Sequence, residues 1–373
     1  MSTYGTNVER ADSGLRSLGD AIPRRSSPVV IWATLGAVMC LYLVYLFGSW
    51  ILGPDFVTNT VGRAESPAWV VTAARTAEVL SVLTFLITNY IYVYKPWRQT
   101  GELSHDALLV FACASLYWLD NCMNYTSYFA QLNSNFVNYG NWVYGIPGWQ
   151  TPNMNHMPEA VIAWGFAYSS WFVLLPMIWG SKVISFTRSR FPKASTLELV
   201  GAAFVALVIF DFVLEGTLVH YHLYTYGGSI RSLTLWAGQV DQFPLYESVL
   251  WGGAWTLFSC LYYFRDDKGN TWVERGADRL KVGKGTLKFI RFLALVAAAN
   301  AIFMTYAIFI NYIQLNSDKF PDNMPAYLVA GLCGEGTPYT CPDPAYPLAK
   351  RSAPTNRTIA PNVVSGNSGA NGP

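Results

Sequence analysis

The sequence is poor in charge, and this scarcity limits the classes of protein that it can encode. Only 13% of its 373 residues are Asp, Glu, Lys or Arg, whereas 52% are apolar. A soluble domain carries about 25% charged residues. The net charge of +2 gives no indication of a nucleic-acid partner, and none is expected. This composition predicts an all-α, polytopic bundle of transmembrane helices whose surroundings are a lipid bilayer.

Histidine is also scarce, with four residues in the chain. Four are too few for the spaced histidine clusters of membrane di-iron oxygenases and desaturases. Residues 289–313 lack the lysine that a retinal protein needs in its last span. His156, His220 and His222 leave open a metal site completed by a carboxylate, but a His-x-His at a helix end is more often an interfacial pair. We therefore predict no metal and no other cofactor.

Cysteine usage does not indicate a disulfide framework. Four of the six cysteines lie in apolar runs, where a thiol behaves as a small hydrophobic group. Cys333 and Cys341 lie close together in a polar, Pro-rich segment. These two can pair if that segment faces an oxidising compartment.

Long apolar runs are abundant, and a span needs roughly 20 residues to cross ~30 Å of hydrocarbon. The sequence predicts about seven spans, at about 28–52, 68–94, 106–129, 158–180, 197–219, 244–264 and 289–313. Together they form one membrane domain, residues 28–315. Residues 1–27 are expected to be a disordered leader and residues 316–373 a largely disordered tail, because residues 1–27 and 340–373 are rich in Ser, Gly, Pro and Asn.

Lys and Arg are distributed unequally between the two sets of loops. With the N-terminus inside, the leader and the inner loops hold 17 Lys and Arg residues, whereas the outer loops hold only Arg63 and Arg231. Positive residues in short loops favour the cytoplasmic side. We predict that the N-terminus is cytoplasmic and that the C-terminal tail is extracytoplasmic.

Acidic side chains within the predicted spans are the main functional signal. Those inside a span or at its edge are Glu78, Asp120, Glu159, Asp211, Glu215 and Glu247. With ~1.5 Å of rise per residue, they collect toward the non-cytoplasmic face. A charged carboxylate at the bilayer centre costs at least ~2.5 kcal/mol, so these groups should face a wet cavity or one another.

Each of these acids also has a structural explanation. Arg75 and Glu78, spaced i, i+3, can form a local ion pair. Glu159 and Glu247 fall in first helical turns, where an acid complements the helix dipole. Asp120, Asp211 and Glu215 can form buried hydrogen bonds that hold neighbouring helices together. The sequence leaves these alternatives open.

The outer loop 132–157 carries no Asp, Glu, Lys or Arg, yet it combines six asparagines with aromatic residues. It is too apolar for a linker and too polar for a span. We predict a lid folded over the outer mouth, with Tyr139, Trp142 and Trp149 as aromatic walls. An interfacial aromatic belt is the alternative.

Four short motifs occur from the end of the third predicted span to the start of the fourth: DNCMNY at 120–125, YGNW at 139–142, IPGW at 146–149 and PE at 158–159. This pattern resembles the AveC-like spirocyclase family, polytopic bacterial membrane proteins named for the spiroketal-forming cyclase/dehydratase of avermectin biosynthesis. The resemblance covers about residues 28–315. It implies a multi-pass protein of the bacterial plasma membrane and an enzyme of apolar secondary metabolites, and it assigns no catalytic residue.

We predict a cofactor-independent cyclase or dehydratase that acts on a lipophilic polyketide- or terpenoid-type substrate. Buried carboxyls beside like charges favour their protonated form, so one acid donates a proton to a ketone or hemiketal oxygen. An ionised partner stabilises the oxocarbenium ion and takes the proton from the attacking hydroxyl. Asp211 is the predicted donor, with Asp120 or Glu215 as its partner. The predicted substrate-binding residues are Asn121, Asn124, Glu159, Glu247, Tyr139, Trp142 and Trp149.

Two other functions remain open. A transporter or proton-coupled carrier of a lipophilic metabolite also needs intramembrane acids, although the odd number of spans and the lack of an internal repeat disfavour it. A non-catalytic accessory protein should tolerate neutralisation of Asp120, Asp211 and Glu215 together. The sequence identifies neither the substrate nor the oligomeric state.

Overall fold

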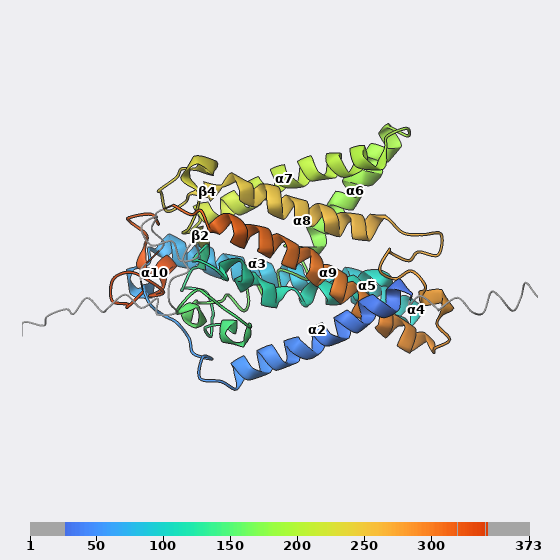
Figure 1. Ribbon diagram of the computed structural model, residues 1–373, viewed down its shortest axis with the longest axis horizontal. Helices are drawn as coiled ribbons and strands as arrows, with labels where there is room; N and C mark the ends of the chain where they lie inside the picture. The colour runs from blue at the N-terminus through green and yellow to red at the C-terminus, as the bar shows by residue number, and fades with distance from the viewer. Residues whose placement is uncertain (1–26, 319, 340, 342–373) are drawn as a thin grey trace, which may run out of the picture.

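The computed structural model describes residues 27–318, 320–339 and 341. The described part is mostly helical, as predicted, and its long helices run back and forth along the longest dimension of the molecule (Figure 1). All but one residue of the expected leader, and most of the expected tail, lie outside the described residues.

The α-helices are α2 (Pro28–Ile51), α3 (Ala68–Asn89), α4 (Lys95–Thr100), α5 (His105–Ala114), α6 (Leu174–Arg190), α7 (Thr196–His220), α8 (Leu245–Tyr263), α9 (Lys284–Gln314) and α10 (Ala326–Val329). A π-helix, η2 (Tyr90–Tyr94), joins α3 to α4, and a 3-10 helix, η3 (Tyr117–Asn124), follows α5. Shorter 3-10 helices are η1 (Arg63–Glu65), η4 (Val143–Gly145), η5 (Met154–His156), η6 (Arg231–Leu233) and η7 (Ala277–Arg279).

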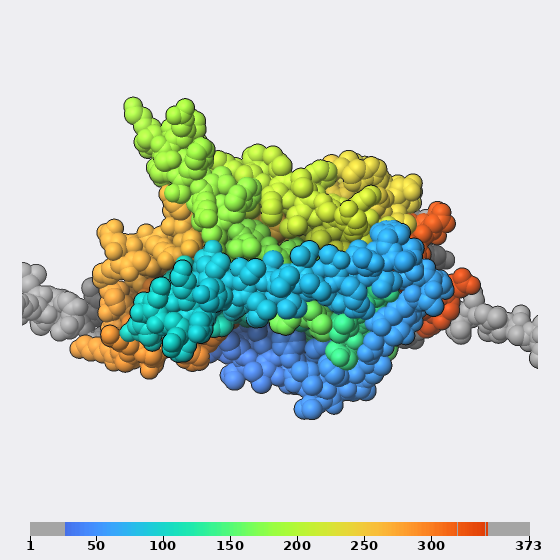
Figure 2. Space-filling model, turned by 180° about the vertical axis from the view of Figure 1, so that it is seen from behind, coloured from blue at the N-terminus to red at the C-terminus, as the bar shows by residue number. Residues whose placement is uncertain are grey.

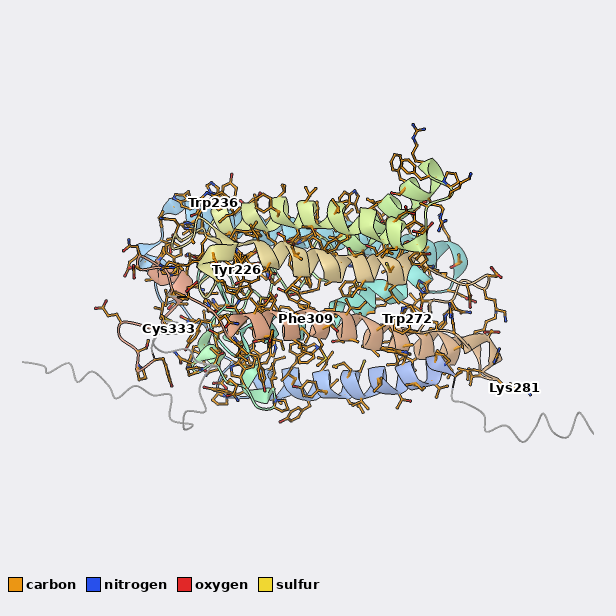
Figure 3. All side chains as sticks on the ribbon, turned by 45° about the horizontal axis from the view of Figure 1, so that its top comes forward. Tyr226, Trp236, Trp272, Lys281, Phe309 and Cys333 are labelled. Atoms are coloured by element: carbon orange, nitrogen blue, oxygen red, sulfur yellow. A yellow bond between two sulfur atoms is a disulfide. The ribbon has the colours of Figure 1, made fainter. Side chains whose placement is uncertain are left out.

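Two short antiparallel strand pairs lie at one end of the helical bundle. Strand β1 (Ala130–Leu132) pairs with β2 (Tyr224–Tyr226), and β3 (Thr234–Leu235) pairs with β4 (Phe243–Pro244). We call this the β end. Figure 3 shows Tyr226 and Cys333 toward the β end, and Trp272 and Lys281 at the opposite end of the bundle.

Four helical segments in the described part are long and apolar enough to cross a membrane. They are Pro28–Ile51, Ala68–Thr100, Thr196–His220 and Lys284–Gln314. They correspond to the first, second, fifth and seventh predicted spans, and α8 corresponds to the sixth. The chain therefore has helices of the kind found in integral membrane proteins. Seven crossings and the orientation of the termini remain predictions.

The third predicted span, 106–129, is α-helical only in its first half. The α5 helix ends at Ala114, where Ser115 Oγ donates to the Ala112 carbonyl and accepts from Asn300 Nδ2 of α9 at 2.9 Å. Trp118 Nε1 also donates to Asn300 Oδ1, at 2.8 Å. These tertiary hydrogen bonds, together with the Asp- and Asn-rich run that follows, favour the 3-10 geometry of η3 over a longer α-helix.

The fourth predicted span, 158–180, is irregular as far as Val173 and forms α6 only from Leu174. Pro176 cannot donate a hydrogen bond to the carbonyl of Phe172, four residues earlier. Trp255 Nε1 of α8 donates to that carbonyl instead, at 2.8 Å. Non-helical backbone is tolerated at membrane depth where it is buried in protein or lines a cavity.

The second span continues without interruption into α4, and Figure 2 shows it crossing one face of the molecule from end to end. Pro96 explains the π-helix within it, because the ring prevents a normal bond to the Tyr92 carbonyl. Ser104 Oγ donates to that carbonyl at 3.3 Å. The outer side of this segment is apolar and exposed, as a surface in contact with lipid should be.

Helix α2 packs lengthwise against α9 at a very short distance. Gly36 of α2 lies against the backbone of Leu293, and a Cβ placed on Gly36 would be 1.9 Å from the Leu293 carbonyl oxygen. Ala33 of α2 and Ala294 and Ala298 of α9 are also buried. Small residues at such positions let two helix backbones approach closely.

A buried ion network closes the end opposite to the β end. The Glu274 carboxylate, in the loop between α8 and α9, is fully buried. It contacts His105 Nε2 at 2.9 Å and accepts from Arg291 Nε at 2.7 Å and Thr271 Oγ1 at 2.8 Å. Burial alone raises the pKa of Glu274, but the hydrogen bonds and charges of these partners lower it to about 2.

Because the folded-state pKa of Glu274 is lower than its unfolded value, Glu274 stabilises the fold above about pH 5, and this contribution is lost as the pH falls. The wild-type chain should lose about 2 kcal/mol more stability between pH 6 and pH 3 than a Glu274→Gln variant. Unfolding of both proteins in the same detergent at several pH values measures this difference. Parallel pH profiles would show that the network contributes no charge-dependent stability.

The first part of the segment after α9 is folded, and the residues whose composition predicts disorder, 340–373, lie outside the described part apart from Cys341. Residues 320–339 and 341, here called the C-terminal strap, lie against the β end. Phe320 is buried against Gly227, and Asn153 Nδ2 donates to the carbonyls of Gly331 and Leu332. Buried apolar side chains outweigh the polar composition of this segment. Cys333 and Cys341 form a disulfide within it.

Candidate active site

A buried cavity lies between η3, the irregular segment before α6, and helices α7, α8 and α9. Three carboxyls from separate elements line it: Asp120 of η3, Glu215 of α7 and Glu247 of α8. Trp164, Phe172, Trp251 and Phe303 supply aromatic walls. The cavity has a volume of about 30 Å³, which suffices for about two water molecules.

Each cavity carboxyl is held by the hydroxyl of one tyrosine from another segment. Tyr306 OH of α9 donates to Glu247 Oε1 at 2.5 Å. The other two pairs are Tyr168 with Asp120 and Tyr226 with Glu215. All six side chains are buried. A tyrosine hydroxyl can donate to a carboxylate without bringing a positive charge, so the site keeps its acidic character.

The short strands position part of this arrangement. Helix α7 ends at His220, and the chain turns back through residues 221–223 to form β2. This return places Tyr226 beside Glu215, which is on the last turns of α7. The pairing of Ala130 with Tyr226 then joins β2 to β1, and Ala130 itself lines the cavity.

Asp211 and Glu159 are buried close to the cavity but do not line it. Asp211 lies one helical turn before Glu215, and neither of its oxygens makes a well-formed hydrogen bond to a described residue. Glu215 and Glu247 both interact electrostatically with it. Glu159 is next to Asp120 and accepts from Asn121 Nδ2 at 2.9 Å. Of the predicted acids, Asp120, Glu215 and Glu247 therefore meet at one cavity, and Asp211 and Glu159 lie next to them outside its lining.

The two predicted amide residues have different surroundings. Asn124 lines the cavity, but both of its polar atoms hold the following turn: Oδ1 accepts from the Phe129 and Ala130 amides, and Nδ2 donates to the Ala130 carbonyl. Asn121 is fully buried, and besides Glu159 it contacts Asn141. Both side chains are thus occupied in fixing the walls of the site.

The predicted aromatic walls of loop 132–157 lie outside the cavity lining. Tyr139 stacks on Phe56, and Trp142 is buried with its Nε1 donating to the Trp118 carbonyl at 3.0 Å. Trp149 packs edge-on against Tyr125. These rings pack within the loop and against its neighbours, so the aromatic walls of the cavity come from other segments.

Glu78 belongs to a different contact. The predicted local pair forms, with Arg75 Nη1 2.5 Å from Glu78 Oε2. Glu78 Oε1 accepts from the Val137 amide at 2.7 Å, and Arg75 Nη2 donates to the Asn135 carbonyl at 2.7 Å. This ion pair therefore attaches loop 132–157 to α3.

Two of the histidines considered for a metal site have other partners, and His220 Nδ1 lies 3.8 Å from Asp241 Oδ2. His222 Nδ1 lies 2.8 Å from the hydroxyl of Tyr327 in the C-terminal strap. Within residues 27–318, 320–339 and 341, no group of three His, Cys, Asp or Glu side chains is placed to hold a metal ion.

Sequence reasoning missed the tyrosines Tyr168, Tyr226 and Tyr306, and it missed Trp251. Trp251 follows Glu247 by four residues in a predicted span, which places both on one helix face. That spacing was a usable signal. The three tyrosines have no such signal in the sequence, because the carboxyls that they contact lie 48, 11 and 59 residues away along the chain.

A sequence model of one protein family, described as "Spirocyclase AveC-like", matches residues 102–329, more than half of the chain. The matched region contains all of the carboxyls and tyrosines of the cavity. No curated protein and no solved structure matches the chain.

Proposed function

The chain belongs to the AveC-like spirocyclase family, as its motifs predicted, and from this membership and the carboxyl-lined cavity we propose that it is a membrane-embedded cyclase or dehydratase. Its substrate in this proposal is a lipophilic polyketide- or terpenoid-type molecule, and its catalytic groups are carboxyls that need no cofactor.

The observation that carries the proposal is the convergence of Asp120, Glu215 and Glu247 on one cavity with aromatic walls. Among the described residues, no Lys, Arg or His lines this cavity. Three carboxylates close together without a cation repel one another, so the cluster favours a state in which it holds protons. A buried acid with a proton beside an ionised acid is the arrangement that general acid–base catalysis needs.

The residue roles follow from position. Glu215 lines the cavity and is the proposed proton donor to a ketone or hemiketal oxygen, and Asp211, one turn behind it, is its proposed proton reserve. Asp120, which lines the cavity from η3, is the proposed acceptor of the proton from the attacking hydroxyl. The aromatic rings stabilise the cationic intermediate through their π faces.

The proposed reaction balances without an external reactant. A hydroxyl adds to a protonated ketone to give a hemiketal, and the proton passes to the acceptor carboxylate. Protonation of the hemiketal hydroxyl releases water and leaves an oxocarbenium ion, and a second hydroxyl then closes the ring and returns the proton. Because the cavity has room for about two water molecules, the aromatic side chains must move to admit such a substrate.

The experiment that tests this function uses the full chain in sealed proteoliposomes with a lipophilic dihydroxyketone. Mass spectrometry of the extracted lipid phase should show a cyclic product that has lost one water, and only when the protein is present. Accumulation of the unchanged compound inside the vesicles would instead identify a carrier. Neither conversion nor uptake, across a panel of dihydroxyketones of different lengths, would contradict the proposal.

A further inference from the structure

Three polar atoms in the cavity wall make no well-formed hydrogen bond to a described residue, and one of them is the Tyr224 hydroxyl of β2. The other two, Glu247 Oε2 and Trp251 Nε1, come from one helix, α8. Both residues line the cavity, and both are only 1% exposed. They lie four residues apart on α8, so their side chains share one face of the helix.

Unpartnered buried groups of this kind need a hydrogen-bonding partner from outside the chain, either a water molecule or a polar group of a ligand. A buried donor or acceptor without a partner costs about 1–3 kcal/mol, and native proteins leave few of them. The indole N–H is only a donor, whereas a carboxylate oxygen is an acceptor. A ligand group that satisfies both atoms must accept a hydrogen bond from the indole N–H and donate one to the carboxylate oxygen.

The surroundings hold both side chains in fixed orientations. Tyr306 donates to Glu247 Oε1 at 2.5 Å. The Tyr226 hydroxyl, which also interacts with Glu247, donates its hydrogen to Glu215, so Oε2 makes no well-formed hydrogen bond. The Trp251 indole is packed between the rings of Phe172, Phe303 and Tyr306, with centroid distances of 5.3, 4.9 and 4.7 Å. The polar pair is therefore surrounded by apolar surface that suits a hydrocarbon chain or ring.

We propose that Glu247 and Trp251 form a subsite for one hydroxyl group of a lipophilic alcohol. The alcohol oxygen accepts from Trp251 Nε1, and its hydrogen is donated to Glu247 Oε2. The cavity has room for the hydroxyl, which occupies about the volume of one water, and the hydrocarbon part requires the same movement of aromatic side chains as the proposed substrate. This inference rests on the proposed function in that it takes the cavity as the substrate site, and it adds which chemical group is recognised there.

The test compares ligands that differ only in the hydrogen-bonding group. The full chain, purified in detergent, is titrated with decan-1-ol, with its methyl ether and with decan-2-one, and the midpoint of thermal unfolding is followed. The alcohol should raise the midpoint saturably. The ether and the ketone, which cannot donate to Glu247, should bind at least about tenfold more weakly.

The matched variants are Trp251→Phe, which removes the N–H and keeps an aromatic ring, and Trp179→Phe, on a partly exposed residue outside the cavity. Trp251→Phe should weaken alcohol binding about tenfold, because it removes the hydrogen bond to the alcohol oxygen, whereas Trp179→Phe should leave alcohol binding unchanged. Equal binding of alcohol, ether and ketone by the unaltered chain would overturn the subsite, and that comparison remains decisive if Trp251→Phe does not fold.

This binding test is independent of turnover. Selective alcohol binding supports the subsite even when no dihydroxyketone is converted, in which case the proposed reaction fails and the subsite stands. Conversion without any preference for the alcohol would overturn the subsite and leave the proposed reaction intact.

Discussion

Replacing Glu215 with Gln should lower turnover of the cyclised substrate by about 10²- to 10⁴-fold, because a general acid or base contributes that much to the rate. The amide has nearly the same shape as the acid, and its oxygen can still accept the Tyr226 hydroxyl that holds Glu215 in place. What it cannot do is release a proton. We therefore expect a folded, membrane-inserted protein that has lost its chemistry.

The control for this substitution lies on the same helix. Glu198, in the first turn of α7, forms a capping box with Ser195 and is exposed. Glu198→Gln keeps the helix and the cavity, so turnover should stay within about twofold of wild type. Rates measured by single-time-point mass spectrometry in proteoliposomes suffice, because the expected difference is large.

Asp211→Asn refines the same experiment. If Asp211 is the reserve from which Glu215 regains its proton, its loss should slow turnover less than the loss of Glu215 and more than Glu198→Gln. Wild-type turnover in Glu215→Gln would contradict the assignment of the donor. A larger effect at Asp211 than at Glu215 would restore the role that the sequence pattern alone suggested for Asp211.

The second large effect concerns the contact between α2 and α9. Gly36→Ala should destabilise the protein by about 3 kcal/mol, or prevent accumulation of folded protein, because overpacking at a close helix contact costs this much. The added methyl would lie 1.9 Å from the Leu293 carbonyl oxygen, and backbone atoms can yield only if the two helices separate. Thermal unfolding in detergent measures the loss.

Gly48→Ala is the matched control for Gly36→Ala. Gly48 lies on the same helix, and a Cβ there meets nothing within 4 Å. In an exposed helix position Ala is favoured over Gly by about 1 kcal/mol, so this variant should be as stable as wild type or slightly more so. Equal behaviour of the two variants would show that α2 and α9 are farther apart than their backbones indicate.

The sequence predicts the long helices well because their apolar runs are uninterrupted. Thr196–His220 and Lys284–Gln314 lie within a few residues of the predicted spans. The irregular halves of the third and fourth spans were not predictable, because they depend on side chains from distant helices. Asn300 of α9 bonds the Ser115 hydroxyl where α5 ends, and Trp255 of α8 donates to the Phe172 carbonyl, which a continuous α-helix would have bonded internally.

The acidic residues of the candidate site were predictable from the sequence, whereas the aromatic residues that line its cavity were not. Asp120, Glu215 and Glu247 stand out because a carboxyl in an apolar run has few alternatives to a shared polar interior. The rings of Tyr139, Trp142 and Trp149 have many alternatives, since an aromatic side chain in an irregular loop packs against whichever apolar neighbour is near. No periodicity specifies their direction in such a loop.

The C-terminal strap has a consequence for the order in which the protein matures. Ribosomes make the chain from its N-terminus, so every helix from α2 to α9 exists before Phe320 emerges to cover Gly227, the neighbour of Tyr226. Until then the turn that holds Tyr226 against Glu215 lacks its outer support. A nascent chain can thus complete its helical bundle first, and the turn that supports the carboxyl-lined cavity is covered last.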